Sequence, residues 1–312
     1  MATVTLAESA KLTQDDLVSG VIENIITTNQ MFQLLPFDGF SGNALSYNRE
    51  NALGGVGVAG VGTDLSASGT TYKDPATFTK VSASLTKIIG DAEVDNLIQA
   101  TRSDSGNNQE AIQVASKAKH LGREYQRMMI NGSGTGNEFA GMAALCPASQ
   151  TFTAGANGAP LSFELLDQAT DAIEDKDGQV DYITMNKRSR RKYRTLLRAL
   201  GGASISEVYK LPNGYEVIAY SGYPIFANDW ITNDEVQGSE TAATSIYAGT
   251  LDDGSRKYGI AGLTSEVESG IRVIPVGESE TKDETITRVR WYCGFALFSE
   301  KGISRIKGIN AE

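Results

Sequence analysis

Residues 39–88 read GFSGNALSYNRENALGGVGVAGVGTDLSASGTTYKDPATFTKVSASLTKI. Strand-like segments at 44–49 and 77–89 flank a centre rich in Gly, Ser, Thr and Asp. The second segment alternates weakly between its two faces, as in a solvated hairpin. The centre has too few aromatic residues to offset its ordering entropy, about 1–2 kcal/mol per residue. This stretch therefore predicts an extended hairpin that is stable only when it lies on a neighbouring molecule.

Two helices are predicted on either side of the hairpin. Residues 13–27 form an amphipathic pattern that Thr13 can cap, with an apolar stripe that precedes any obvious core. A longer helix is predicted at 107–130, capped by Asn107 or Asn108 and ended by a left-handed Gly132. Its expected apolar stripe consists of Ile112, Ala115, Ala118, Leu121, Tyr125 and Met128.

The C-terminal half alternates helices with strands. Helices are predicted at 162–174 and 186–200, and strands at 182–185, 216–220, 224–228, 245–250 and 271–276. In the last strand, at 286–298, five residues share one face: Val289, Trp291, Cys293, Phe295 and Leu297. Segregated helices and mostly antiparallel strands indicate an α+β protein.

Composition excludes several classes of protein. The 38 acidic residues outnumber the 28 Lys and Arg, for a net charge of −10, which argues against binding nucleic acid by phosphate neutralisation. No run of 18 apolar residues predicts a membrane span, and residues 1–8 do not resemble a signal peptide. Cys146 and Cys293 are too far apart in sequence to indicate a disulfide framework.

No catalytic, cofactor or metal site is predicted. Residues 55–60, GVGVAG, match the dinucleotide fingerprint, but no helix pattern follows to receive a pyrophosphate. His120 is the single histidine and lies in a predicted helix without a nucleophile motif. One His and two distant Cys are too few for a zinc site, and the acidic residues near 174–181 lack calcium-loop spacing.

Charged side chains are candidates for contacts between subunits. On the helix at 186–200, a basic face is predicted, made of Lys187, Arg191, Arg194 and Arg198. The acidic cluster that contains Asp175 and Asp177 is its candidate partner on the next subunit of a ring. A solvated face and contact with packaged DNA stay open as alternatives.

The order of these elements resembles the major capsid proteins of tailed bacteriophages, which have the Hong Kong 97-like fold. Four stretches carry the resemblance: 182–186 (YITMN), 222–229 (GYPIFAND), 248–251 (AGTL) and 288–298. The resemblance implies an N-terminal arm at 1–38, an extended loop at 39–88 and a peripheral domain with a spine helix at 89–150. It further implies an axial domain at 151–265, and peripheral strands that return to the axial domain at 266–312.

The resemblance also implies a function and partners. The expected product is a shell of hexamers and pentamers around double-stranded DNA in the virion, assembled in the host cytoplasm without a membrane. Expected partners are a portal, a separate scaffolding protein, DNA without sequence-specific contact, and in some shells a decoration protein. Lys73 is a candidate contact because some relatives crosslink a loop lysine, although no Asn or Glu partner aligns here. An encapsulin-type nanocompartment and a soluble hydrolase are the alternative functions.

Overall fold

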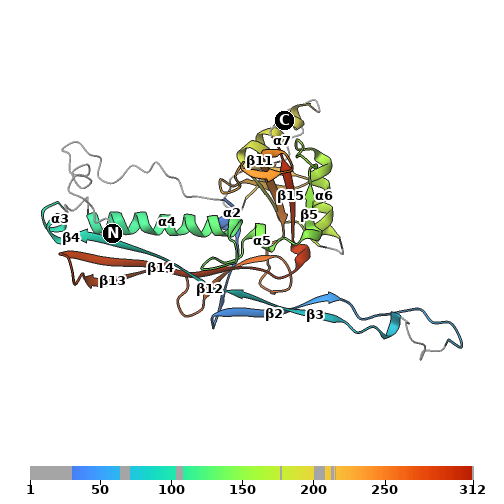
Figure 1. The fold of residues 1–312 in the computed structure, drawn as a ribbon, viewed down its shortest axis with the longest axis horizontal. Helices are drawn as coiled ribbons and strands as arrows, with labels where there is room; N and C mark the ends of the chain where they lie inside the picture. The colour runs from blue at the N-terminus through green and yellow to red at the C-terminus, as the bar shows by residue number, and fades with distance from the viewer. Residues whose placement is uncertain are drawn as a thin grey trace.

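A computed structural model describes residues 30–63, 71–102, 108–175, 178–199, 208–211, 214 and 216–310. The helix predicted at 13–27 lies outside these residues. Figure 1 shows an elongated molecule with three parts: a thin peripheral layer beside helix α4, an axial block, and a hairpin that projects alone. Among the described residues, no helix is both long and apolar enough to span a membrane.

The peripheral layer is a five-stranded sheet covered on one face by α4 (Gln109–Asn131). Its central strand is β14 (Glu284–Leu297), which pairs with β4 along one edge and with β13 and β12 along the other. The remaining strand, β1, pairs in parallel with β12. The bounds of these strands are Phe37–Phe40 for β1, Thr86–Asp95 for β4, Ile260–Ser265 for β12 and Arg272–Glu278 for β13.

The predicted apolar face of β14 is buried. Val289, Trp291 and Cys293 are at most 5% exposed and belong to the main core. From α4, Tyr125 places its ring 4.8 Å from that of Trp291 and donates a hydrogen bond to the Gly294 carbonyl. The side chains of β14 therefore fix α4 against the sheet.

The axial block is an eight-stranded mixed sheet with α6 (Phe163–Glu174) and α7 (Lys187–Ala199) packed on it. Ser162 caps α6 as predicted, and Asn186 accepts a hydrogen bond from the third residue of α7. The strands are β5 Thr151–Thr153, β6 Tyr182–Met185, β7 Val208–Lys210, β8 Glu216–Tyr220, β9 Tyr223–Ala227, β10 Glu235–Gln237, β11 Glu240–Gly249 and β15 Ile303–Ile309. Short helices occur elsewhere: α2 Gln30–Leu34, α3 Asn96–Arg102, α5 Met142–Leu145, η1 Thr71–Lys73, η2 Ala148–Gln150 and η3 Glu300–Gly302.

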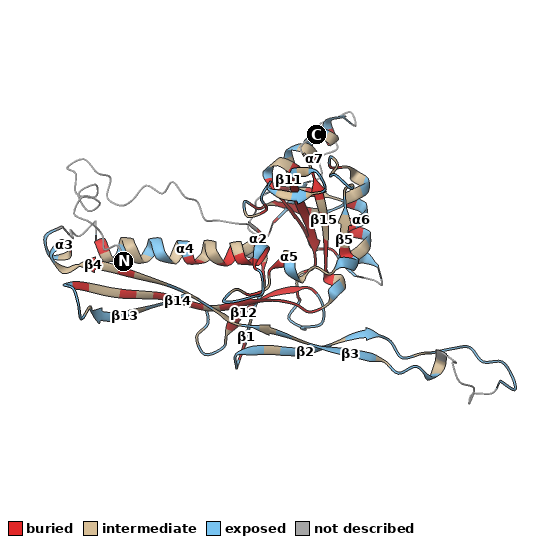
Figure 2. Cartoon of the chain, viewed as in Figure 1, coloured by how far each residue is buried: buried red, intermediate tan, exposed pale blue. Residues whose placement is uncertain are grey.

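One continuous core joins the peripheral layer to the axial block. Tyr182, Phe226 and Tyr247 of the axial sheet belong to the same buried cluster as Tyr125 and Trp291 of the peripheral layer. Figure 2 shows buried residues concentrated where these two parts meet, and exposed residues along the hairpin. The hairpin is therefore the part that this core does not support.

The hairpin consists of β2 (Ala44–Ala52) and β3 (Thr77–Ser84), which form a sheet of their own. The prediction of one strand at 77–89 is wrong. Pairing changes at Leu85, after which the chain continues as β4 and joins β14 in the peripheral layer. A two-residue alternation continues through such a change of partner, so the sequence does not reveal the break.

Two predictions about helix α4, its buried stripe and the conformation of Gly132, are wrong in part. Asn108 is its N-cap, but only Leu121, Tyr125 and Met128 of the predicted stripe are buried, while Ala115 is exposed. Gly132 is not left-handed, because its φ is −57°. A Cβ at Gly132 would lie 2.2 Å from the Phe139 carbonyl oxygen and 2.5 Å from that of Met128. Close backbone approach, not a positive φ, therefore requires glycine here.

Gly132→Ala is expected to lower the free energy of unfolding by about 1–3 kcal/mol, because its methyl group would press on two backbone carbonyls. The matched control is Gly122→Ala in the middle of α4, where nothing lies within 4 Å of the added methyl. That change is expected to stabilise the helix by roughly 0.5–1 kcal/mol. Urea unfolding followed by circular dichroism measures both. Equal effects of the two variants would contradict the close approach at Gly132.

Candidate assembly surfaces

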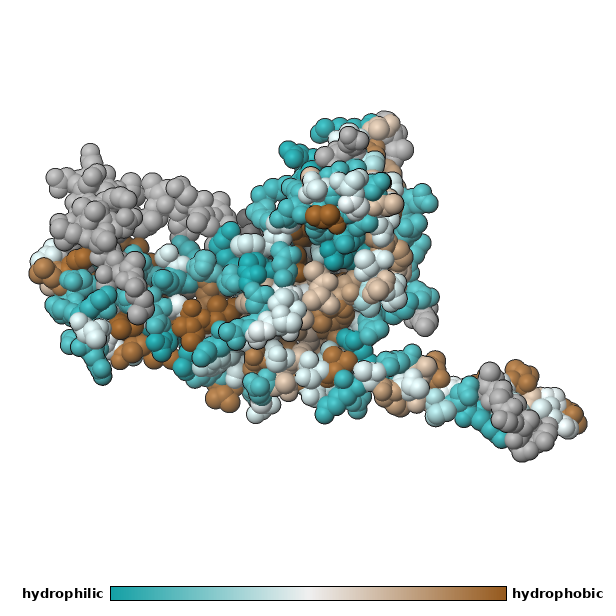
Figure 3. Space-filling view, viewed as in Figure 1, coloured by the Kyte–Doolittle hydropathy of each residue, from teal (hydrophilic) through white to brown (hydrophobic). Residues whose placement is uncertain are grey.

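The far end of the hairpin exposes apolar side chains. Val56, Val58 and Val61 are 90%, 105% and 111% exposed, and Leu53 and Phe78 are also largely exposed. In Figure 3, apolar atoms occur at the end of the hairpin farthest from the axial block. Leu53, Val56, Val58 and Val61 are called the tip patch, whereas Phe78 pairs with Glu50 nearer the base. None of the described residues covers the tip patch, although burying such side chains is favourable.

The base of the hairpin is fixed to the body by two side chains of β2. Arg49 donates to the carbonyl oxygens of Leu297 (2.6 Å) and Phe298 (2.8 Å), and to Oε1 of Glu300 (3.0 Å). Tyr47 donates from its hydroxyl to the Leu297 carbonyl at 2.6 Å. Burial raises the pKa of the Tyr47 phenol, and Arg49 opposes this shift. The phenol therefore stays protonated at neutral pH and can donate.

The predicted basic face lies on α7. Tyr193 and Leu197 are buried against the axial sheet, so Arg191, Arg194 and Arg198 are exposed on the opposite side of the helix. Lys187 forms an ion pair at 2.8 Å with Asp229, which follows β9, and both groups are 65% exposed. An ion pair this exposed contributes little to stability. The sequence analysis did not foresee Asp229 as a partner.

The acidic cluster has partners within its own chain. Asp175 forms an ion pair at 2.8 Å with Lys301, and Glu174 accepts a hydrogen bond from the Tyr223 hydroxyl at 2.6 Å. Asp181 accepts from the backbone N–H of Leu251. Asp177 lies outside the described residues. Within the part of the chain that the structure describes, no ion pair joins Asp175 to the basic face of α7.

Lys73 ends the 3-10 helix η1 in the outer half of the hairpin, where its side chain is exposed. This position lets Lys73 reach another molecule. The basic face of α7 and Asp175 lie on the axial block, so the described structure does not bring Lys73 together with them.

A second apolar surface, which the sequence analysis missed, lies on β13 and the segment before it. Val267 is 79% exposed, and Ile271, Val273 and Val276 are between 42% and 51% exposed. Because β13 pairs with β14 on one side only, its other edge is free in the described structure. Apolar residues on a predicted edge strand were the available signal. Figure 1 places β13 at the opposite end of the molecule from the hairpin.

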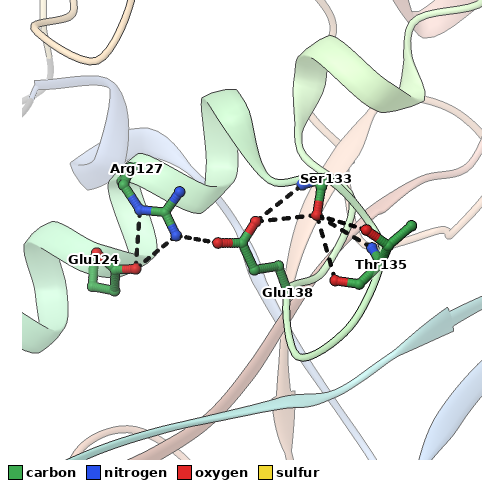
Figure 4. Close-up of polar contacts among 5 residues, drawn as sticks. All are labelled: Glu124, Arg127, Ser133, Thr135 and Glu138. Atoms are coloured by element: carbon green, nitrogen blue, oxygen red, sulfur yellow. Dashed lines mark hydrogen bonds and ion pairs between the residues drawn. The ribbon is translucent and has the colours of Figure 1, made fainter.

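A network of polar groups holds the loop that follows α4 (Figure 4). The Arg127 guanidinium donates to both Glu124 and Glu138, and Glu138 accepts from the backbone N–H and hydroxyl of Ser133. The Arg127 bond, followed by the Ser133 N–H bond, lowers the pKa of Glu138 below its ordinary value. Ionised Glu138 therefore stabilises the turn that joins α4 to the axial block.

The motif at 55–60 and His120 lie in different parts of the fold, the first in the hairpin and the second on α4. Residues 55–60 have neither helix nor strand structure, and His120 is exposed on α4. The described residues contain no group of three or more His, Cys, Asp or Glu side chains that could hold a metal ion. Burial raises the pKa of both thiols, Cys146 and Cys293.

The turn after α4 is expected to loosen in acid. A carboxyl whose folded-state pKa is lowered stabilises the fold above its unfolded-state pKa, about 4.3 for Glu. This stabilisation is lost as the pH falls through the lower, folded-state pKa of Glu138. The protection factor of the Ser133 amide, which compares its hydrogen-exchange rate with the intrinsic rate at each pH, measures the effect. Glu138→Gln should remove the pH dependence of the protection factor, and Glu280→Gln, at an exposed glutamate, should keep it. A protection factor that still falls in acid in Glu138→Gln would contradict this assignment.

No protein-family model matches the chain, and no curated protein matches it by sequence. Solved structures match nearly its whole length. An encapsulin complex from Synechococcus elongatus gives a TM-score of 0.73 at 15% identity, over 100% of this chain and 97% of that chain. The capsid of cyanophage A-1(L) gives 0.70 at 14% identity, over 97% and 98%. The capsid of a native GTA particle gives 0.67 at 12% identity, over 99% and 100%.

These matches cover the spine helix, the peripheral sheet, the axial block and the hairpin together. Their elements follow the order that the sequence shares with the capsid proteins of tailed bacteriophages. The chain therefore has the Hong Kong 97-like fold, which phage capsid proteins and encapsulins share.

Proposed function

We propose that this chain is the major capsid protein of a tailed bacteriophage, which assembles with copies of itself into an icosahedral shell around double-stranded DNA. The observation that carries the proposal is the hairpin. Within the described part of the chain, its strands pair only with each other, and it holds almost fully exposed valines at its far end. An isolated two-stranded hairpin is marginally stable in water. A second copy of the chain is the partner that a shell supplies at every hairpin.

The two apolar surfaces favour contact between unlike parts of neighbouring copies. The tip patch and the exposed face of β13 lie at opposite ends of the molecule (Figure 1). A contact between different surfaces on two copies is heterologous, and such contacts form rings when the rotation closes. Hexamers and pentamers are such rings. Each contact is weak, but a subunit makes several at once.

The basic face of α7 is proposed to contact the acidic cluster of the next subunit around the ring. Arg191, Arg194 and Arg198 are exposed and are available to a neighbour. Asp175 would then bind an arginine of the neighbouring subunit in place of, or in addition to, Lys301. Asp177 would contribute a second carboxylate to this contact. The division into an arm at 1–38, a loop at 39–88, an axial domain at 151–265 and peripheral segments at 89–150 and 266–312 is part of the same proposal.

The remaining partners follow from this function. A portal and a separate scaffolding protein would act during assembly in the host cytoplasm, and a decoration protein could bind the outside of the finished virion. The net charge of −10 supports a shell that contains DNA without condensing it by charge.

The second candidate function is an encapsulin-type nanocompartment, which the likeness to the Synechococcus elongatus encapsulin complex favours. The contents of purified particles separate the two functions. Packaged double-stranded DNA supports the capsid, and a co-purifying enzyme cargo supports the nanocompartment.

The purified chain is expected to form closed particles or capsomers, seen by sedimentation velocity and negative-stain microscopy. Replacing Val56, Val58 and Val61 together by Ser should lower the association constant for assembly at least about tenfold. The reason is that each replacement removes roughly 1.5 kcal/mol or more of hydrophobic stabilisation from the contact between subunits. The subunit melting temperature should not change, because all three valines are exposed in the subunit. The matched control replaces the same three residues by Ile. Full assembly of the Ser variant, or a monomer at all concentrations for the parent, would contradict the proposal.

Arg191→Glu is expected to weaken assembly and to make it less sensitive to salt, because a cation facing a carboxylate is replaced by an anion. Light scattering at 50 mM and 500 mM NaCl measures both effects. Lys307→Glu, a charge reversal at a half-buried position on β15, serves as the control. Assembly of Arg191→Glu with the same yield and salt dependence as the parent would count against this contact.

A further inference from the structure

The base of the hairpin contacts the body where the chain passes between its two sheets. Leu297 is the last residue of β14 in the peripheral layer, and η3 and β15 of the axial sheet follow within a few residues. Leu297 and Phe298 are the residues whose carbonyls accept hydrogen bonds from Tyr47 and Arg49. The hairpin is thus bound to the connection between the sheets and also packs on peripheral-sheet residues, among them Ala261 and Leu263 of β12.

The contact is confined to the base of the hairpin and involves both of its strands. Leu45, Tyr47, Ala83 and Leu85 pack against a small buried cluster that includes Phe298, and the Tyr47 and Phe298 rings lie 5.3 Å apart. Arg49 is the outermost residue of β2 with a hydrogen bond or ion pair to the body in the described structure. Its side chain is 15% exposed, whereas the strands beyond it are mostly exposed.

The hairpin acts as a lever on this contact. From Arg49 to the tip patch, the chain extends by up to about 3.3 Å per residue. A small rotation at the base therefore becomes a shift of several ångströms at Val56 and Val58. Beside the contact, a cleft of about 880 Å³ opens between the hairpin and the axial block, lined by Asn48, Gln150 and other residues. Among the described residues, no hydrogen bond or ion pair joins the hairpin strands to the body beyond Arg49, so the contact at the base and the continuation of β3 into β4 hold this angle.

We propose that Arg49 is a positioning residue that sets the angle between the hairpin and the body. Together with Tyr47 it couples this angle to the connection between β14 and β15. Residues Tyr47, Arg49, Leu297, Phe298 and Glu300 are called the Arg49 clamp. The consequence for shell assembly depends on the proposed function, but the clamp itself is a property of the single subunit.

The chemistry of the clamp requires arginine. A guanidinium is a planar fork whose several N–H groups can reach two carbonyls and a carboxylate at the same time. A lysine ammonium on a flexible chain has no such fixed geometry. Lysine at position 49 would keep the charge and the attraction to Glu300 but lose the fixed direction. Charge alone is therefore not expected to restore the angle.

The test is the distance between spin labels on Thr77→Cys in the hairpin and Ala111→Cys on α4. Cys146→Ser removes the half-buried native thiol, and Cys293 is buried, so neither takes up the label. An excess of unlabelled chain prevents distances between labels on different copies from being measured. The parent is expected to give one narrow distribution. Arg49→Ala and Arg49→Lys should both give a clearly broader one, and Tyr47→Phe an intermediate one. Lys80→Ala, which removes an exposed cation from the same hairpin, should leave the distribution narrow.

An unchanged distribution in Arg49→Ala, or full rescue by Arg49→Lys, would overturn the proposal. Thermal melting distinguishes a loss of the clamp from a general loss of folding. Variants that lack only the clamp should still melt in one cooperative transition. If Arg49→Ala does not fold, Tyr47→Phe and Arg49→Lys carry the test. If the Arg49 variants give broad distance distributions but the parent chain never assembles, the clamp is supported and the proposed function is contradicted. The two proposals can therefore fail independently.

Discussion

The pairing of strand β14 is the interaction on which the rest of the structure depends. One edge of β14 pairs with β4 from Glu284 to Cys293, and the other pairs first with β13 and then with β12. Its inward side chains pack under α4, and the carbonyls of its last residue, Leu297, and of Phe298 just after it accept the hydrogen bonds of the hairpin. One strand thereby places the spine helix, the axial block and the hairpin relative to one another.

This arrangement separates stability from assembly. The buried cluster around Tyr125 and Trp291 holds the body together without help from a neighbour. The described part of the hairpin has no such cluster beyond its base. On the proposed function, contacts with a neighbouring copy offset the ordering entropy of its outer residues. Exposed valines at the tip are tolerable in one subunit, and their burial supplies a driving force when many copies meet. A shell made this way depends on many weak contacts whose direction is set by the hairpin base.

The sequence predicted the elements whose signals are local. Asn108 and Ser162 cap their helices as expected, and the alternation along 286–298 identified the buried face of β14. Short strand β1 escaped prediction because four residues carry no readable period. The Arg49 clamp escaped because its partners are about 250 positions away in sequence, and nothing near Arg49 indicates them. The role of Gly132 was misassigned since a close backbone approach leaves no local signature.

The central claim is that the hairpin of one copy is stabilised by lying on another copy. A cryo-electron-microscopy map of particles assembled from the purified chain tests this claim most directly. The account predicts an ordered hairpin in every subunit, with Val56, Val58 and Val61 buried against an adjacent subunit. A closed particle whose hairpins project into solvent, or are missing from the map while the body is ordered, would contradict it.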